Sequence, residues 1–179
     1  MPADRVILVD LTDREIGSSE KMAAHEKGLL HRAFSVFLFN GSRLLLQKRA
    51  ADKYHCPGLW TNTCCSHPRP GEKTAKAAQR RLVEELGTEP CEITELCSFF
   101  YRYEFSNGLA EYECDHVFLG EYSPDAELCP NPDEVEEAAW WDICELEEEL
   151  RLNPDRFTPW FIICAPMVIN AIRQNICNE

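Results

Sequence analysis

The stretch from Thr61 to Gly87 reads TNTCCSHPRPGEKTAKAAQRRLVEELG and decides how the chain is organised. A strand leads into it, and if that strand is regular, its period of two puts Cys65 and His67 on one face. A charged helix follows, in which Arg81 and Glu85 lie one turn apart. A thiol, an imidazole, a cation and a carboxylate are therefore brought together within 27 residues.

The same stretch resembles the Nudix box, G-x5-E-x7-R-E-U-x-E-E-x-G-U, in which U is an aliphatic residue. The positions that match in register are Glu72, Arg80, Leu82, Glu84, Glu85 and Gly87. The departures are Ser66 for the first glycine, Arg81 for the first glutamate of the helix and Thr88 for the last aliphatic residue. In Nudix hydrolases the helix glutamates gather the magnesium ions used for hydrolysis, so an arginine among them weakens that cluster.

These departures resemble the type I isopentenyl-diphosphate isomerases, a Nudix-fold family that does not hydrolyse its substrate. Their Thr-Asn-x-x-Cys-x-His-Pro motif is present from Thr61 to Pro68, and the resemblance extends from Lys21 to Trp160. It implies an α+β fold with a Nudix-like mixed β-sheet core flanked by α-helices. We expect one such domain over residues 1–179.

Length and composition predict an intracellular protein with an ample core. A chain of 179 residues is the usual size of one domain. The charged start carries no secretory signal, and no apolar run reaches membrane-spanning length. The ten cysteines contain no CxxC pair, and most are expected to be inert, reduced thiols. We therefore expect a cytoplasmic protein that binds no membrane, and we expect it to be a monomer.

The net charge of −13 argues against nucleic acid as a partner. It hides an asymmetry, because residues 21–81 hold 12 Lys and Arg against 3 Asp and Glu, a local charge of +9. An anionic small molecule would bind in this basic part.

The remaining chain reads as strands and helices in mixed order. Strands are expected over residues 6–10, 33–39, 44–48, 93–105, 111–122 and 135–143. Helices are expected over residues 20–30, broken at Gly28, over 145–152, and from Thr158-Pro159 onward. Residues 12–19 read as a turn and residues 123–133 as an acidic loop.

Two carboxylates and three histidines form a candidate metal site. Glu111 and Glu113 share one strand face, and if they face inward they need a cation to neutralise them. The spacing of the first two histidines does not pair them, but the resemblance does, through K-x3-H at Lys21 and a histidine before Ala-Phe-Ser. The resulting set suits Mn, Fe, Zn or, less readily, Mg, as one tightly bound divalent ion on His25, His31, His67, Glu111 and Glu113.

The resemblance implies a small-molecule diphosphate as the substrate. Its phosphates would be surrounded by Lys21, Arg49, Lys53 and Arg81, since guanidinium forks and ammonium groups both bind phosphate oxygens. Glu85 and the diphosphate would share a second ion, Mg, which keeps oxygen ligands.

The implied reaction interconverts isopentenyl diphosphate and dimethylallyl diphosphate. A proton is added to an unactivated double bond and another is removed from the neighbouring carbon, which needs an acid, an opposed base and no water. The implied pair is Glu113 as the forward acid and Cys65 as the base, and these roles could be reversed because the reaction is reversible. We expect Tyr103, or alternatively Tyr101, to support Glu113, and the face of Trp160 to stabilise the cationic intermediate.

Two other functions stay open. A Nudix pyrophosphohydrolase acting on a nucleoside diphosphate derivative is disfavoured by Ser66 and Arg81, and it gives the Cys-x-His motif no role. A non-catalytic module that binds a metal or a diphosphate leaves Cys65 and Trp160 without purpose.

Overall fold

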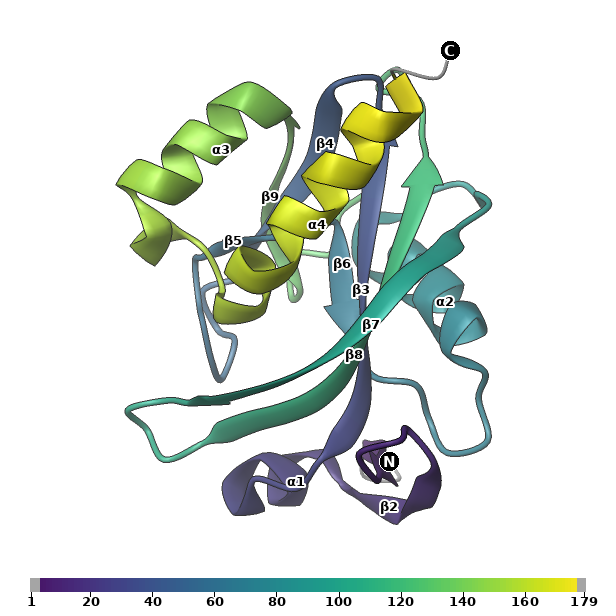
Figure 1. The fold of residues 1–179 in the computed structure, drawn as a ribbon, viewed down its shortest axis with the longest axis vertical. Coiled ribbons are helices and arrows are strands. Elements are labelled where there is room, and N and C mark those ends of the chain that lie inside the picture. Colours follow the sequence, from purple (N-terminus) through teal and green to yellow (C-terminus); the bar gives the residue numbers. More distant parts are fainter. Residues whose placement is uncertain (1–3, 177–179) are drawn as a thin grey trace.

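The computed structural model describes residues 4–176, which form a sheet of nine strands and four α-helices (Figure 1). The strands are β1 (Arg5–Val9), β2 (Glu15–Glu20), β3 (His31–Asn40), β4 (Arg43–Arg49), β5 (Trp60–Thr61), β6 (Cys64–Ser66), β7 (Thr94–Glu104), β8 (Ala110–Glu121) and β9 (Val135–Asp142). The helices are α1 (Lys21–Lys27), α2 (Thr74–Leu86), α3 (Ile143–Leu152) and α4 (Pro159–Ile176), with a short 3₁₀ turn at Pro154–Arg156.

Strand β3 is the centre of the sheet. It runs parallel to β8 along most of its length and antiparallel to β6 and β4. β8 pairs in turn with β7, and β4 pairs with β5 and β9. The sheet is therefore mixed, with the two strands that flank β3 in its first half, β6 and β8, coming from distant parts of the chain.

The alternation of side chains along β3 divides the core into two layers. Phe34 and Val36 pack on one face with Leu82 of α2, whereas Phe37 packs on the other face with Phe161 of α4. In Figure 1, α4 crosses in front of β3 and β4. The sheet thus lies between helices, which agrees with the expected mixed β-sheet core flanked by α-helices.

Most expected elements occur within a few residues of their predicted bounds, but the turn expected at residues 12–19 is wrong. Most of that segment belongs to β2, which pairs with β1 at the edge of the sheet. Its residues are exposed or half-buried, so backbone pairing without a buried face produced no alternating apolar signal. The predicted break at Gly28 is confirmed, because this residue caps α1 with a φ of 58°.

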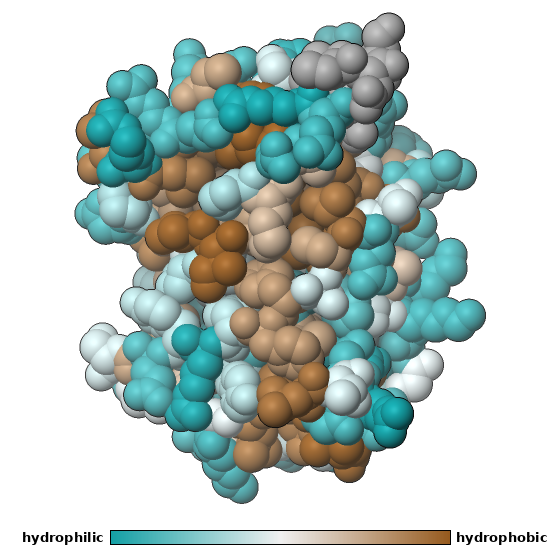
Figure 2. All heavy atoms as spheres, viewed as in Figure 1, coloured by the Kyte–Doolittle hydropathy of each residue, from teal (hydrophilic) through white to brown (hydrophobic). Residues whose placement is uncertain are grey.

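The surface seen in Figure 2 is polar around its margins, and apolar side chains gather over α4 and β7. Ile163, Met167 and Phe100 are partly exposed in these elements. Among the described helices, none combines the length and the apolar character that crossing a membrane requires. The nine cysteines of the described chain are free thiols.

Candidate active site

Three adjacent strands bring the predicted residues together. Cys65 on β6 lies opposite Ser35 of β3, and Glu113 on β8 lies opposite His31 of β3. Because β6 and β8 flank the same strand, the thiol and the carboxylate reach the same cavity from its two sides. Trp160, from the first turn of α4, also lines this cavity.

Three imidazoles converge on one carboxylate at the start of β3. His67 Nε2 lies 2.8 Å from Glu113 Oε1 and 3.2 Å from His31 Nε2, and His31 Nε2 lies 3.3 Å from the same oxygen. The ring of His25 is 4.9 Å from that of His31, and its Nε2 is buried with no hydrogen-bond partner among the described residues. A buried nitrogen without a partner needs an explanation, and a metal ion would supply one.

The outer nitrogens of two of these rings support the same interpretation. His25 Nδ1 lies 2.7 Å from the carbonyl oxygen of Lys21, and His31 Nδ1 lies 2.7 Å from that of Leu29. Each Nδ1–H is therefore donated to the backbone, which leaves the Nε2 lone pair toward the cluster. Histidines that bind metals are commonly oriented in this way, so the residues present fit a divalent metal ion.

The charges of the cluster are also unbalanced without a cation. Burial lowers the pKa of His67 to about 3, and although burial acts likewise on His31, contact with Glu113 leaves the pKa of His31 raised. Burial opposes ionisation of Glu113, but its bonds to His31 and His67 hold its pKa well below the ordinary value. The imidazoles of His31 and His67 thus favour the ionised form of Glu113, and a metal ion held by the same side chains would favour it as well.

In the structure Tyr101, and not Tyr103, lies beside Glu113. Tyr101 is buried, and its hydroxyl donates to Glu113 Oε2 at 2.7 Å and also contacts Glu111. Tyr103 lies two residues further along β7, so its side chain points to the same face of the strand as that of Tyr101. It is nearer the tip of the β7–β8 hairpin, where it is 44% exposed and packs on Phe105. The expectation for Tyr103 was therefore wrong in position, because the hairpin has left the body of the protein at that point (Figure 1).

The thiol of Cys65 lies beside a buried guanidinium. Arg49 Nη1 is 3.8 Å from Cys65 Sγ, and the same guanidinium stands 5.4 Å from the centre of the Trp160 ring. Burial raises the pKa of Cys65 to about 12, although the charge of Arg49 opposes the shift. The thiol therefore keeps its proton at neutral pH. Trp160 is itself held by a 3.2 Å hydrogen bond from Nε1 to Asn62.

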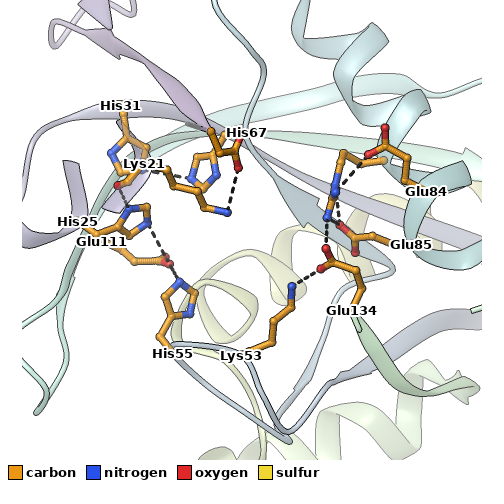
Figure 3. Close-up of polar contacts among 12 residues, drawn as sticks. Lys21, His25, His31, Lys53, His55, His67, Glu84, Glu85, Glu111 and Glu134 are labelled. Atoms are coloured by element: carbon orange, nitrogen blue, oxygen red, sulfur yellow. Dashed lines mark hydrogen bonds and ion pairs between the residues drawn. The ribbon is translucent and has the colours of Figure 1, made fainter. Parts of the chain in front are cut away.

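The four predicted phosphate-binding cations line the cavity, and Lys21, Lys53 and Arg81 are paired with acids. Figure 3 shows Lys53 pointing toward Glu134 on the side of the cavity away from the cluster of three imidazoles. Arg81 Nη2 lies 2.6 Å from Glu85 and 3.1 Å from Glu134, and Lys53 Nζ contacts Glu134 as well. Lys21 Nζ lies 3.8 Å from a carboxylate oxygen of Asp4. The structure thus places all four predicted cations, Arg49 included, at the cavity.

Sequence reasoning missed three residues of this cavity. Asp115 continues the alternation of Glu111 and Glu113, so the period of two could have found it; it is buried and accepts a 2.8 Å bond from Ser35 Oγ. His55 and Glu134 come from loops, and nothing in their spacing connects them with the site. His55 Nε2 nevertheless lies 2.7 Å from Glu111 Oε1.

Comparisons with known proteins find relatives over nearly the whole chain. The NUDIX domain model matches residues 29–161. Isopentenyl-diphosphate Delta-isomerase 2 of Aromatoleum aromaticum is 51% identical over 173 residues, which cover 96% of this chain and 90% of that protein. The isopentenyl-diphosphate Delta-isomerase of Pectobacterium atrosepticum is 47% identical and covers 90% of this chain and 89% of its own.

Solved structures share the fold at lower identity. A protein of Deinococcus radiodurans superposes with a TM-score of 0.67 at 22% identity, covering 83% of this chain and 90% of that one. A MutT NUDIX hydrolase of Burkholderia pseudomallei gives a TM-score of 0.52 at 24% identity, covering 64% and 84%. At these identities the likeness concerns the fold alone.

Proposed function

The chain belongs to the isopentenyl-diphosphate Delta-isomerase family of NUDIX-domain proteins, and we propose that it interconverts isopentenyl diphosphate and dimethylallyl diphosphate. The observation that carries the proposal is the placement of Cys65 and Glu113 on the two strands flanking β3, in one cavity beside Trp160. Allylic isomerisation needs this arrangement, because one proton is delivered and another is removed at the two carbons that flank the substituted carbon.

The protonation states of the pair support one direction of transfer. Cys65 holds its proton and Glu113 is ionised, so the thiol is ready to give a proton to the terminal carbon of the double bond, which leaves the positive charge on the substituted carbon. The carboxylate then takes a proton from the methylene group on the other side of that substituted carbon. This is the reverse of the direction expected from the sequence. In the opposite reaction each residue takes the other role, by reversibility. Tyr101 holds Glu113 in place through its hydroxyl.

The positive charge that develops on the substrate between the two proton transfers is met by the ring of Trp160. Its indole N–H is tied to Asn62, so the ring keeps a fixed orientation, and its face already accepts the guanidinium of Arg49. An aromatic face of this kind attracts a cation without offering a nucleophile that would trap it. Trp160 belongs to the apolar cluster beneath α4, which would help to exclude water from this part of the cavity.

We assign the tightly bound metal to His25, His31, His67, Glu111 and Glu113, and the mixed nitrogen and oxygen donors suit Mn, Fe or Zn better than Mg. When bound, the ion would neutralise the two carboxylates and fix their orientation. The diphosphate would lie among Lys21, Arg49, Lys53 and Arg81, with Mg between it and Glu85. We infer that the enzyme acts in the cytoplasm as a monomeric single domain.

The test is to mix the protein with isopentenyl diphosphate and Mn²⁺ or Mg²⁺ and to follow the reaction by proton NMR and by phosphate release. We expect the two methyl signals of the allylic product and no phosphate. Released phosphate would instead indicate a pyrophosphohydrolase, and binding with neither product would indicate a non-catalytic module. Either result would overturn the proposal.

A further inference from the structure

His55 connects the two ends of the cavity. It lies in the loop between β4 and β5, yet its side chain is buried, with only 6% of the residue exposed. Its Nε2 is 2.7 Å from Glu111 Oε1, and its Nδ1 is 3.4 Å from Arg49 Nη2. Arg49 also donates to the backbone oxygen of His55 at 3.3 Å. His55 therefore touches one carboxylate assigned to the metal and one cation assigned to the diphosphate.

The partners of His55 determine which nitrogen carries its hydrogen. A guanidinium can only donate, so Nδ1 facing Arg49 is the acceptor and Nε2 carries the hydrogen that is donated to Glu111. The atoms of His25, His55 and Glu111 that could bind a metal ion lie within 4.8 Å of one another. In this tautomer, however, His55 has no lone pair left on Nε2 for an ion. His55 therefore lies behind Glu111, whose second oxygen contacts the hydroxyl of Tyr101.

Aromatic neighbours keep the His55 ring in this orientation. It stacks on Phe105 with ring centres 5.1 Å apart and planes at 3°, and it meets Trp160 edge-on at 5.7 Å. A ring packed in this way cannot turn independently. A shift of Arg49 toward a bound anion would therefore act on His55 and, through its contact with Nε2, on Glu111.

We propose that His55 is a positioning residue that couples diphosphate binding to metal binding, by fixing Glu111 on one side and Arg49 on the other. The proposal rests on the proposed function for the identity of the two ligands. Coupling of this kind is reciprocal, so pyrophosphate should tighten the metal and the metal should tighten pyrophosphate. Loss of a partner that orients a metal ligand commonly lowers metal affinity by about 10- to 100-fold.

The experiment measures Mn²⁺ affinity by chelator competition, with and without inorganic pyrophosphate and without turnover. His55→Phe keeps the stacking on Phe105 and removes both nitrogens. We expect it to lose about 10- to 100-fold in Mn²⁺ affinity and to lose the tightening by pyrophosphate. His55→Gln keeps an N–H donor. Its Mn²⁺ affinity and the tightening of Mn²⁺ by pyrophosphate should both stay within a few-fold of the wild-type values. His116→Gln, at a histidine on the outer face of β8, should match wild type.

Two results would overturn the proposal. Wild-type affinity in His55→Phe would show that His55 positions nothing, and an equal loss in His55→Gln would make His55 a metal ligand itself. If His55→Phe does not fold, His55→Asn, whose amide is too short to reach Glu111, must show the same losses. Failure of the proposed function is separate, since it would appear as a wild-type protein that couples the two ligands without isomerising the substrate.

Discussion

The two ends of the cavity differ in how far their charged groups are already paired. At the metal end, His25 Nε2 has no hydrogen-bond partner among residues 4–176, and Glu111 and Glu113 share one tyrosine hydroxyl, so a bound cation would complete the contacts of these residues. At the diphosphate end, Lys53 and Arg81 share Glu134, so these two positive charges already have a carboxylate partner. The first end is ready to receive an ion as it stands. The second must exchange an internal carboxylate for the substrate.

The largest effect is expected between the two ends, at the proton-transfer pair. Cys65→Ser and Glu113→Gln should each reduce isomerisation by about 10²- to 10⁴-fold, the usual contribution of one acid or base. Cys64→Ala is the matched control, because Cys64 points to the opposite face and is buried under α2. Rates and circular dichroism spectra check the result. A fully active Cys65→Ser variant, or a folded but inactive Cys64→Ala variant, would contradict the assignment.

The second prediction concerns which end of the cavity holds the tightly bound metal ion. The His67→Asn/Glu111→Gln double variant should be purified without its tightly bound divalent ion, because two of the five converging side chains are lost. Glu85→Gln should keep that ion, since Glu85 belongs to the end where Arg81 already compensates it. Elemental analysis measures both variants. Equal metal in the double variant and in wild type would place the ion elsewhere.

The third prediction compares two variants at the diphosphate end that should change pyrophosphate affinity in opposite directions. Arg81→Glu replaces a cation by an anion and should weaken pyrophosphate binding at least tenfold, which corresponds to about 1.4 kcal/mol. Glu134→Gln removes the internal competitor of Lys53 and Arg81 and should strengthen binding by a few-fold. Titration calorimetry gives both affinities, with phosphate release followed in parallel. Brisk hydrolysis by Arg81→Glu, or unchanged affinity in both variants, would contradict the account.

The same contrast explains what the sequence could predict. The metal end consists largely of strand residues, so alternation alone related Cys65 to His67 and Glu111 to Glu113. Glu134 and His55 come from loops, where no period exists, and their contacts are made only when the chain closes. Tyr101 and Tyr103 lie on the same face of β7. Only the point at which the β7–β8 hairpin extends away from the rest of the protein distinguishes them. β2 was missed because an edge strand can pair without burying a face.

The fourth prediction tests that distinction between the tyrosines. Tyr101→Phe removes the hydroxyl shared by Glu111 and Glu113, and should lower isomerisation by about fivefold, equivalent to a hydrogen bond of about 1 kcal/mol. Tyr103→Phe, with the same chemical change at an exposed site, should have the activity of wild type. Steady-state rates at matched metal loading decide the matter. Equal losses in the two variants would count against the placement of Tyr101.

The smallest effect is expected in the loop that connects the two ends. Glu72 accepts from Arg80 Nε at 2.8 Å and Nη2 at 2.9 Å, and from the backbone N–H of Arg69 at 3.0 Å. These bonds fasten the segment between His67 and α2. Glu72→Gln should therefore destabilise the protein by about 1 kcal/mol at pH 7, as expected for a well-formed but partly exposed pair, without a change in activity.

The pH dependence of that loss follows from the pKa of Glu72. The hydrogen bond from Arg80 is the main cause that holds this pKa below its ordinary value of 4.5. A carboxyl whose pKa is lower in the folded state stabilises the fold fully above its unfolded pKa, and this stabilisation disappears as the pH falls through the folded value. Urea unfolding of wild type and Glu72→Gln, in chelator to exclude metal, should give curves that differ at pH 7 and converge as the pH falls through the lowered pKa of Glu72. A difference independent of pH would show that packing, and not the charge of Glu72, holds the loop.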